Sequence, residues 1–176
     1  MMLGVVLAGG QSSRFGSDKA LALLDGETLL ARAVQTLSQW CDQVVVVGRS
    51  EAPVPCLTDW PRPGMGPLGG IAAALRHAAQ HGFDEVLTLG VDCADLPDDL
   101  PALLGAAPAY VASQPVIGRW PAQGAGAVEA VLAGDGKHSL RALAERLGAR
   151  AVELPRDPAN INTPADLAEL EQRRRD

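Results

Sequence analysis

The sequence predicts an α/β fold with a mostly parallel sheet, because short apolar segments alternate with longer segments of helical periodicity. Valines fill Gln43–Gly48, a pattern typical of a strand buried on both faces. Glu27–Trp40 repeats apolar residues at helical spacing, and Glu85–Val91 is a second apolar strand segment. We therefore expect a Rossmann-like three-layer sandwich with helices on both faces of a mostly parallel central sheet, formed by residues 1–176 as one domain.

The remaining elements continue this alternation. A first strand is predicted at Leu3–Leu7, where an apolar run stops at glycines. Thr163 is a favourable N-cap for the last helix, with Pro164 and Asp166 in the first turn. The run Arg173–Arg175 is expected to be the solvated end of that helix. The other predicted helices are Gly69–Gln80, Asp98–Gly105, Gly126–Ala133 and Ser139–Leu147, and the other predicted strands are Ala109–Ser113 and Arg150–Leu154.

Composition narrows the classes of function. The chain has 176 residues, 47% of them hydrophobic, so a sizeable core is available. The net charge of -6 argues against nucleic acid or an anionic membrane as partner. No membrane-length apolar run or signal peptide is visible, so we expect a soluble, cytoplasmic protein. The three cysteines Cys41, Cys56 and Cys93 match no metal or disulfide spacing, which indicates a reducing compartment.

A glycine-containing loop follows the first predicted strand and carries the strongest functional signal. Glycines let the backbone approach a ligand closely, and successive N–H groups in such a turn can hold an anion. The loop matches neither the P-loop nor the dinucleotide fingerprint, and its alternative is a strand-to-helix turn with incidental charges. Two cations in one short loop favour phosphate binding. The residues expected to act here are Leu7, Ala8, Gly9, Gly10, Ser12, Ser13, Arg14 and Lys19.

Asp92 follows the apolar segment Val86–Val91, so its carboxylate is expected at the ligand-binding edge of the sheet. A carboxylate there can bind Mg²⁺, which prefers oxygen ligands and bridges triphosphate oxygens. The alternative is a helix-capping role, although Asp98 is better placed to cap the following helix. Cys93, next to Asp92, is expected to be a packing residue and not a nucleophile.

A second glycine-rich segment opens the helix predicted at Gly69–Gln80. Gly66, Pro67 and Leu68 are expected to contribute nucleotide contacts there, because exposed N–H groups at a helix start bind polar ligands. Asp59, shortly before it, is expected either to accept hydrogen bonds from a ligand or to stabilise a buried turn. His77 and His81 have a metal-compatible spacing but lack an evident third ligand, so we expect surface residues.

The loop pattern Leu-Ala-Gly-Gly-x-Ser-x-Arg-x-Gly-x-Asp-Lys at residues 7–19 resembles the nucleotidyltransferases related to sugar-nucleotide pyrophosphorylases. Within that group, the chain is most similar to the molybdenum cofactor guanylyltransferases. The resemblance spans nearly the whole chain, because four further segments occur in the family's order. They are Asp59, Gly66–Ile71, Asp92 within Val91–Pro97, and Asn160–Leu167.

This resemblance implies the nucleotide-diphospho-sugar transferase-like fold and transfer of GMP from GTP to the phosphate of molybdopterin. It gives Asp92 the same Mg²⁺-binding role and places guanine recognition around Gly66–Gly70, where Asp59 is expected to contact the guanine edge or the ribose. For this reaction we expect Arg14, Lys19 and Asp92 to be catalytic, with Lys19 and Arg14 stabilising the leaving pyrophosphate. Asn160 and Asn162 are expected to line the pterin-side pocket, whereas the residues alone favour an Asx-type turn there. The family usually has an asparagine near the end of the second strand, where this chain has Gly48 and Arg49.

Three other functions stay open at this point. A cytidylyltransferase on the same cofactor usually carries Ala-Ala-Gly where this chain has Ala8-Gly9-Gly10, and sugar-phosphate nucleotidyltransferases are usually longer. A non-catalytic nucleotide-binding adaptor would not need both Lys19 and Asp92.

The expected partners are GTP and molybdopterin, with molybdoenzyme apoproteins or their chaperones as candidate recipients of the product. The chain is expected to be a monomer or a weak oligomer. Trp60, Arg62 and Trp120 are expected in loops near the site.

Overall fold

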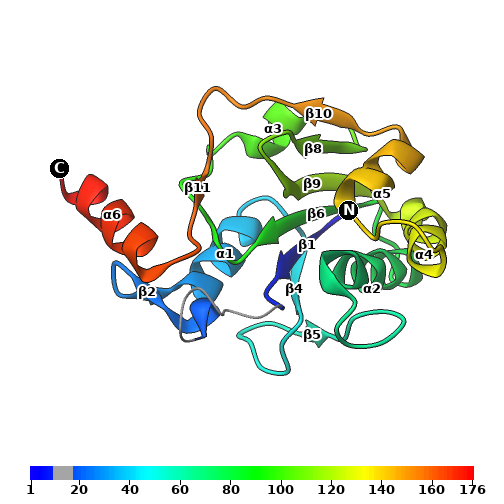
Figure 1. Ribbon diagram of the computed structural model, residues 1–176, viewed down its shortest axis with the longest axis horizontal. Coiled ribbons are helices and arrows are strands. Elements are labelled where there is room, and N and C mark those ends of the chain that lie inside the picture. The colour runs from blue at the N-terminus through cyan, green and yellow to red at the C-terminus, as the bar shows by residue number, and fades with distance from the viewer. Residues whose placement is uncertain (10–17) are drawn as a thin grey trace.

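The computed structural model describes residues 1–9 and 18–176, so the predictions for Gly10, Ser12, Ser13 and Arg14 lie outside the described residues. The described chain forms a seven-stranded sheet covered by helices (Figure 1). In spatial order, its strands are β10 (Arg150–Val152), β8 (Ala109–Val111), β9 (Gln114–Pro121), β6 (Glu85–Gly90), β1 (Met2–Leu7), β4 (Gln43–Val47) and β5 (Cys56–Leu57).

The sheet is mostly parallel, as the sequence predicts. Strands β6, β1, β4 and β5 run parallel to one another, and β10 runs parallel to β8. Strand β9 is antiparallel to both β6 and β8, and it joins the two parallel parts. The described residues also form two short antiparallel pairs, β2 (Leu23–Leu24) with β3 (Glu27–Thr28), and β7 (Cys93–Ala94) with β11 (Ala159–Asn160).

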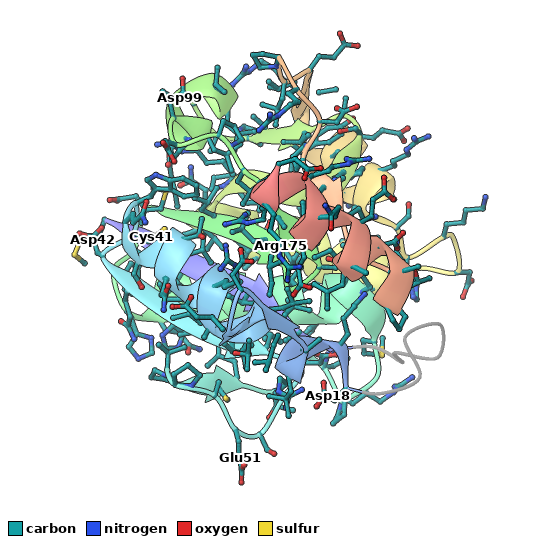
Figure 2. All side chains as sticks on the ribbon, turned by 90° about the vertical axis from the view of Figure 1, so that its left-hand side faces the viewer. Asp18, Cys41, Asp42, Glu51, Asp99 and Arg175 are labelled. Atoms are coloured by element: carbon teal, nitrogen blue, oxygen red, sulfur yellow. The ribbon has the colours of Figure 1, made fainter. Side chains whose placement is uncertain are left out.

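Helices cover both faces of this sheet and complete the three predicted layers. One apolar cluster buries α1 (Leu29–Ser38), α3 (Leu100–Leu104) and part of α6 (Pro164–Arg175) against one face. A second cluster buries α2 (Gly66–Gln80), α4 (Ala125–Ala133) and α5 (Leu140–Leu147) against the other face. Turned by 90°, the structure presents α6 on the side of the molecule that also carries α1 (Figure 2).

The ends of α5 and α6 follow the capping chemistry that the sequence predicts, whereas the expectation that Asp98 caps α3 is wrong, because the N-cap residue is Asp99 and it makes no side-chain hydrogen bond to the helix. Ser139 accepts a hydrogen bond from the Ala142 N–H at the start of α5, and Gly148 ends that helix with a left-handed φ of 64°. Thr163 and Asp166 form a capping box at the start of α6. None of the described helices combines the length and the apolar character that crossing a membrane requires.

Strand β9 is the main element that the sequence prediction missed. The expectation that Trp120 lies in a loop near the site is wrong, because Trp120 belongs to β9 and its side chain is 0% exposed. Its indole Nε1 donates a hydrogen bond of 3.1 Å to Thr88 Oγ1 on β6. Trp120 therefore packs in the core between the sheet and α2, and cannot contact a ligand.

Candidate active site

The carboxyl ends of the central parallel strands meet at one edge of the sheet and define the candidate site. Leu7, the last residue of β1, pairs with Val47 of β4 on one side and with Gly90 of β6 on the other. The glycine loop, Gly48 and Asp92 therefore begin at the same edge. Ala8 extends the pairing, because its N–H donates a hydrogen bond of 2.9 Å to the Val47 carbonyl.

Lys19 and Asp92 come together at this edge from distant parts of the chain. Lys19 begins a short 3₁₀ helix, which Asp18 caps by accepting a hydrogen bond of 3.2 Å from the Ala20 N–H. Lys19 Nζ lies 3.4 Å from Asp92 Oδ2, and the two side chains are 18% and 25% exposed. The contact is long for a charge-assisted hydrogen bond, and both side chains are partly buried with some exposed surface.

Gly48 allows the glycine loop to cross the end of β4. It has a φ of 93°, and a Cβ atom placed on it would collide with the backbone of Gly9. A side chain at Gly48 would therefore displace the backbone at Gly9, where the glycine loop begins.

Arg49 is a residue of this edge that sequence reasoning did not select. Its Nη1 donates hydrogen bonds of 2.9 Å and 2.8 Å to Oδ1 and Oδ2 of Asp18. Because Asp18 caps the turn that carries Lys19, Arg49 fixes the start of that turn. No local pattern signals this contact, because it depends on how β4 ends relative to the glycine loop.

Asp59 lies in the loop between β5 and α2, and it stabilises that loop. Burial raises the pKa of Asp59 above its ordinary value, while hydrogen bonds from the N–H groups of Met65 and Gly64 oppose the shift. A larger residue would not fit at Gly69, because the side chains of Met65 and Asp59 occupy the space that its Cβ would need. These contacts match the turn-stabilising alternative for Asp59, and they leave contact with a nucleotide as a proposal.

Helix α2 begins at Gly66, three residues earlier than predicted. Gly66 has a φ of 73° and open space around it, and Pro67 occupies the first turn. Met65, the N-cap residue, makes no side-chain hydrogen bond to the helix start. The side chain of Leu68 is 1% exposed and packs in the core, so only the backbone of Leu68 can face a ligand.

The segment of Asn160 and Asn162 reaches the same edge from the C-terminal part of the chain. Asn160 of β11 pairs with Cys93 of β7, and the Ile161 N–H donates a hydrogen bond of 2.9 Å to the Asp92 carbonyl. Ile161 is 1% exposed, as the predicted alternation requires, and Asn160 is exposed. The Asn162 backbone joins the start of α6, since its N–H donates to Asp166 Oδ2 at 2.9 Å.

Cys93 and the two histidines behave as non-catalytic groups. Burial raises the pKa of the Cys93 thiol to about 12, and the charge of Asp92 adds to this shift, so the thiol is protonated at neutral pH. The rings of His77 and His81 stack with their centroids 4.0 Å apart, and burial lowers the pKa of His77.

Of the loop residues expected near the site, Trp60 has the Arg76 guanidinium over its ring, 4.8 Å from the ring centroid, and Arg62 is exposed.

Within residues 1–9 and 18–176, no three His, Cys, Asp or Glu side chains gather into a metal-binding cluster. A protein-only metal cage is therefore absent from the described part of the chain. The single carboxylate of Asp92 still fits Mg²⁺, because that ion commonly takes one or two carboxylates and completes its shell with phosphate oxygens and water. The solvent-accessible position of Asp92 is compatible with this mode of binding.

Comparison with known proteins places this site in a family. Residues 4–156 match the MobA-like NTP transferase domain. Molybdenum cofactor guanylyltransferase of Acidiphilium cryptum is 40% identical over 177 residues, which covers 93% of this chain and 90% of the relative. The enzyme of the same name from Rhizobium leguminosarum is 41% identical over 190 residues, with coverages of 96% and 91%.

Two solved structures share the fold. Molybdopterin-guanine dinucleotide biosynthesis protein A from Archaeoglobus fulgidus superposes with a TM-score of 0.78 at 22% identity, covering 99% of both chains. A nucleotidyl transferase from Methanothermobacter superposes with a TM-score of 0.73 at 21% identity, covering 98% of this chain and 97% of its own. At these identities the structures establish the fold, which agrees with the predicted nucleotide-diphospho-sugar transferase-like architecture.

Proposed function

The chain belongs to the family of MobA-like NTP transferases, and on this premise we propose that it transfers GMP from GTP to the phosphate of molybdopterin. The observation that carries the proposal is the meeting of Lys19 and Asp92 at the strand ends that the glycine loop leaves. A guanylyltransferase needs a cation and a carboxylate there, and relatives named for this activity match at 40% and 41% identity over most of both chains.

In the proposed reaction, a phosphate oxygen of molybdopterin attacks the α-phosphorus of GTP. A new phosphorus–oxygen bond forms, the bond between the α-phosphorus and its bridging oxygen breaks, and pyrophosphate leaves with that oxygen. The attacking phosphate monoester is already ionised near neutral pH, so no general base is required. The work of the protein is to align the two substrates and to neutralise charge.

Each proposed contact uses a described feature of the edge. The Lys19 ammonium stabilises the charge that develops on pyrophosphate. Arg14, which lies outside the described residues, is proposed to act with Lys19. The backbone of Leu7, Ala8 and Gly9 supports the nucleotide, with Gly66, Pro67 and Leu68 contributing from the start of α2. Asp59 supports the nucleotide pocket by holding the loop before α2.

We propose that Asp92 holds a Mg²⁺ ion together with the triphosphate. When bound, this ion supplies charge neutralisation on the α- and β-phosphate oxygens. Asp92 Oδ2 lies 3.4 Å from Lys19 Nζ, and Cys93 Sγ lies 3.8 Å from Asp92 Oδ1. The absence of a side chain at Gly90 makes room for the Asp92 carboxylate, because a Cβ on Gly90 would collide with Asp92 Oδ1.

The acceptor is proposed to bind on the side of Asn160 and Asn162. The pairing of β11 with β7 brings this segment next to Asp92, so an acceptor held there lies near the proposed metal ligand. The exposed side chain of Asn160 is available to hydrogen-bond a polar heterocycle such as a pterin. We propose that residues 1–176 act as one catalytic unit that delivers its product to molybdoenzyme apoproteins or their chaperones.

The test is pyrophosphate release by the purified protein with GTP, CTP, ATP or UTP, each with Mg²⁺ and in the presence or absence of molybdopterin. The proposal predicts release with GTP that depends on molybdopterin. Release with CTP in preference to GTP would identify a cytidylyltransferase. Release that requires a sugar phosphate in place of molybdopterin would identify a sugar-phosphate enzyme, and nucleotide binding without release would indicate an adaptor.

A further inference from the structure

Arg174, in the last turn of α6, connects two acidic turns that are remote from each other in sequence. Its Nε donates a hydrogen bond of 2.7 Å to Asp25 Oδ2, and its Nη1 donates one of 2.8 Å to Asp95 Oδ1. Arg174 is exposed, as expected for the solvated helix end Arg173–Arg175, but its side chain also joins both carboxylates. The Arg174 side chain is 34% exposed, whereas the Arg173 side chain is 70% exposed and, among the described residues, pairs along the helix with Glu169.

The two aspartates lie on the segments that carry Lys19 and Asp92. Asp25 lies in the turn between β2 and β3, and β2 separates it from the 3₁₀ helix that Lys19 begins. Asp95 follows Asp92 in the loop between β7 and α3. Both have left-handed backbone conformations, with φ of 51° and 53°, which an aspartate adopts at a modest energetic cost. Arg174 therefore hydrogen-bonds to the residue with the left-handed backbone conformation in each of the two turns.

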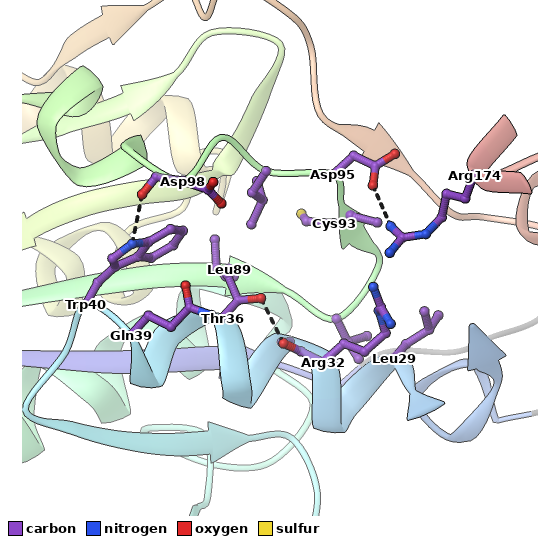
Figure 3. A pocket seen from close by; sticks show the side chains of 14 residues that line it. Leu29, Arg32, Thr36, Gln39, Trp40, Leu89, Cys93, Asp95, Asp98 and Arg174 are labelled. Atoms are coloured by element: carbon purple, nitrogen blue, oxygen red, sulfur yellow. Dashed lines mark hydrogen bonds and ion pairs between the residues drawn. The ribbon is translucent and has the colours of Figure 1, made fainter. Parts of the chain in front are cut away.

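Packing alone gives limited support to this region. A cavity of about 200 Å³ separates α1 from the loop that includes Asp95, and Arg174 lies at its margin (Figure 3). In α6, which the structure describes in full, Leu170 is the one buried side chain. Few buried apolar contacts hold these turns, so the hydrogen bonds of Arg174 to two separate turns are the described contacts that connect them.

We propose that Arg174 is a positioning residue that holds the Lys19 segment and the Asp92 segment at the separation that nucleotidyl transfer requires. The inference rests on the proposed function, and it adds a role for α6, which lies beyond residues 4–156 of the family match. Arg174 touches neither of the two catalytic groups. It acts through Asp25 and Asp95, because fixing both turns restricts the relative motion of the two chain segments that meet at the Lys19–Asp92 pair.

The experiment compares Arg174→Gln with the wild-type chain and with Arg173→Gln, a matched control on the same helical turn. With saturating Mg²⁺ and molybdopterin, Arg174→Gln should lower kcat about tenfold, since small misplacements of reacting groups carry such costs. The KM for GTP should change less than about twofold, because the proposed nucleotide contacts of Leu7–Gly9 and of the start of α2 are left unchanged by the substitution. Arg173→Gln should match the wild type.

Two further variants test the route of the effect. Arg174→Lys has one ammonium in place of a guanidinium that reaches two carboxylates, so its kcat should be intermediate. Asp95→Asn keeps the left-handed turn but removes its charge, and the double variant Arg174→Gln/Asp95→Asn should lose less than the product of the two single losses. Multiplicative losses would contradict a shared route through Asp95.

Amide hydrogen exchange supplies a readout that does not depend on the chemistry. In Arg174→Gln, amides of residues 22–28 and 92–98 should exchange faster than in Arg173→Gln. Equal exchange and equal kcat in these two variants of an active enzyme would overturn the positioning role. Absence of turnover in the wild-type chain would instead contradict the proposed function, and the exchange comparison would still decide whether Arg174 orders the two turns.

Discussion

Lys19 Nζ lies 3.4 Å from Asp92 Oδ2, although 73 positions separate the two residues in the chain. The contact forms because β1 and β6 are adjacent parallel strands whose carboxyl ends open to the same edge. A cation and a carboxylate held this close are suited to bind a triphosphate and its metal ion in one place. The predictions below test the parts of the molecule that create and surround this pair.

Lys19→Ala is expected to lower kcat/KM by about 10²-fold or more, since it removes a cation that faces the charge developing on pyrophosphate. Steady-state pyrophosphate release measures the effect, and circular dichroism should show an unchanged fold. Lys137→Ala, which alters an exposed lysine ahead of α5, is the matched control and should retain wild-type activity. Near-normal activity of the Lys19 variant would contradict its catalytic role.

Asp92→Asn is expected to raise the Mg²⁺ concentration needed for half-maximal activity and to lower the maximal rate, because an amide is a weaker metal ligand than a carboxylate. For the wild-type chain, chelation with EDTA should abolish turnover and added Mg²⁺ should restore it. Asp98→Asn changes an exposed aspartate of the same loop and serves as the control. An unaltered Mg²⁺ titration in the Asp92 variant would exclude Asp92 as the metal ligand.

Gly48→Ala is expected to destabilise the fold by about 2 kcal/mol and to weaken GTP binding. The new methyl group would occupy a left-handed backbone position and collide with Gly9 at the start of the glycine loop. Chemical denaturation and equilibrium GTP titration measure the two effects. Gly126→Ala in α4, where a Cβ meets open space, should instead stabilise the protein by up to about 1 kcal/mol.

Asp59→Asn is expected to change the pH dependence of stability in a defined direction. Burial raises the folded-state pKa of Asp59, so its stabilising contribution is complete below the unfolded pKa of about 3.9 and is lost as pH rises through the folded pKa. The asparagine variant lacks this titration. Its free energy of unfolding relative to the wild type should therefore increase as pH rises through this interval, as denaturation at several pH values would reveal.

A constant difference between the Asp59→Asn variant and the wild type across that pH interval would contradict the assigned effect of burial. Comparing the difference at each pH, and not the absolute stabilities, removes the contribution of every other titrating group.

Local chemistry explains the parts of the fold that were predictable from the sequence. Ser139, Gly148 and Thr163 act at helix ends through contacts within a few residues, so their residue types reveal the boundaries directly. The valine-rich β4 was equally clear, because a strand buried on both faces needs an unbroken apolar run. Placement of the glycine loop and Asp92 at one edge followed from the rule for parallel sheets.

The missed features depend on contacts between distant segments. Strand β9 contains Gly118 and ends at Pro121, which obscures strand alternation, and the burial of Trp120 requires β6 as a neighbour. The contact of Arg49 with Asp18 and the contacts of Arg174 with two turns likewise arise from tertiary structure. The pairing of β7 with β11 involves two residues on each side, too few for a periodic pattern.

The most direct test of the central claim follows the phosphorus atoms of GTP. The purified chain is incubated with molybdopterin, Mg²⁺ and GTP labelled at either the α- or the γ-phosphate, and the products are separated by chromatography. GMP transfer predicts the α-label in the molybdopterin dinucleotide and the γ-label in pyrophosphate. Appearance of the γ-label as inorganic phosphate, with the α-label retained in free GDP, would contradict nucleotidyl transfer.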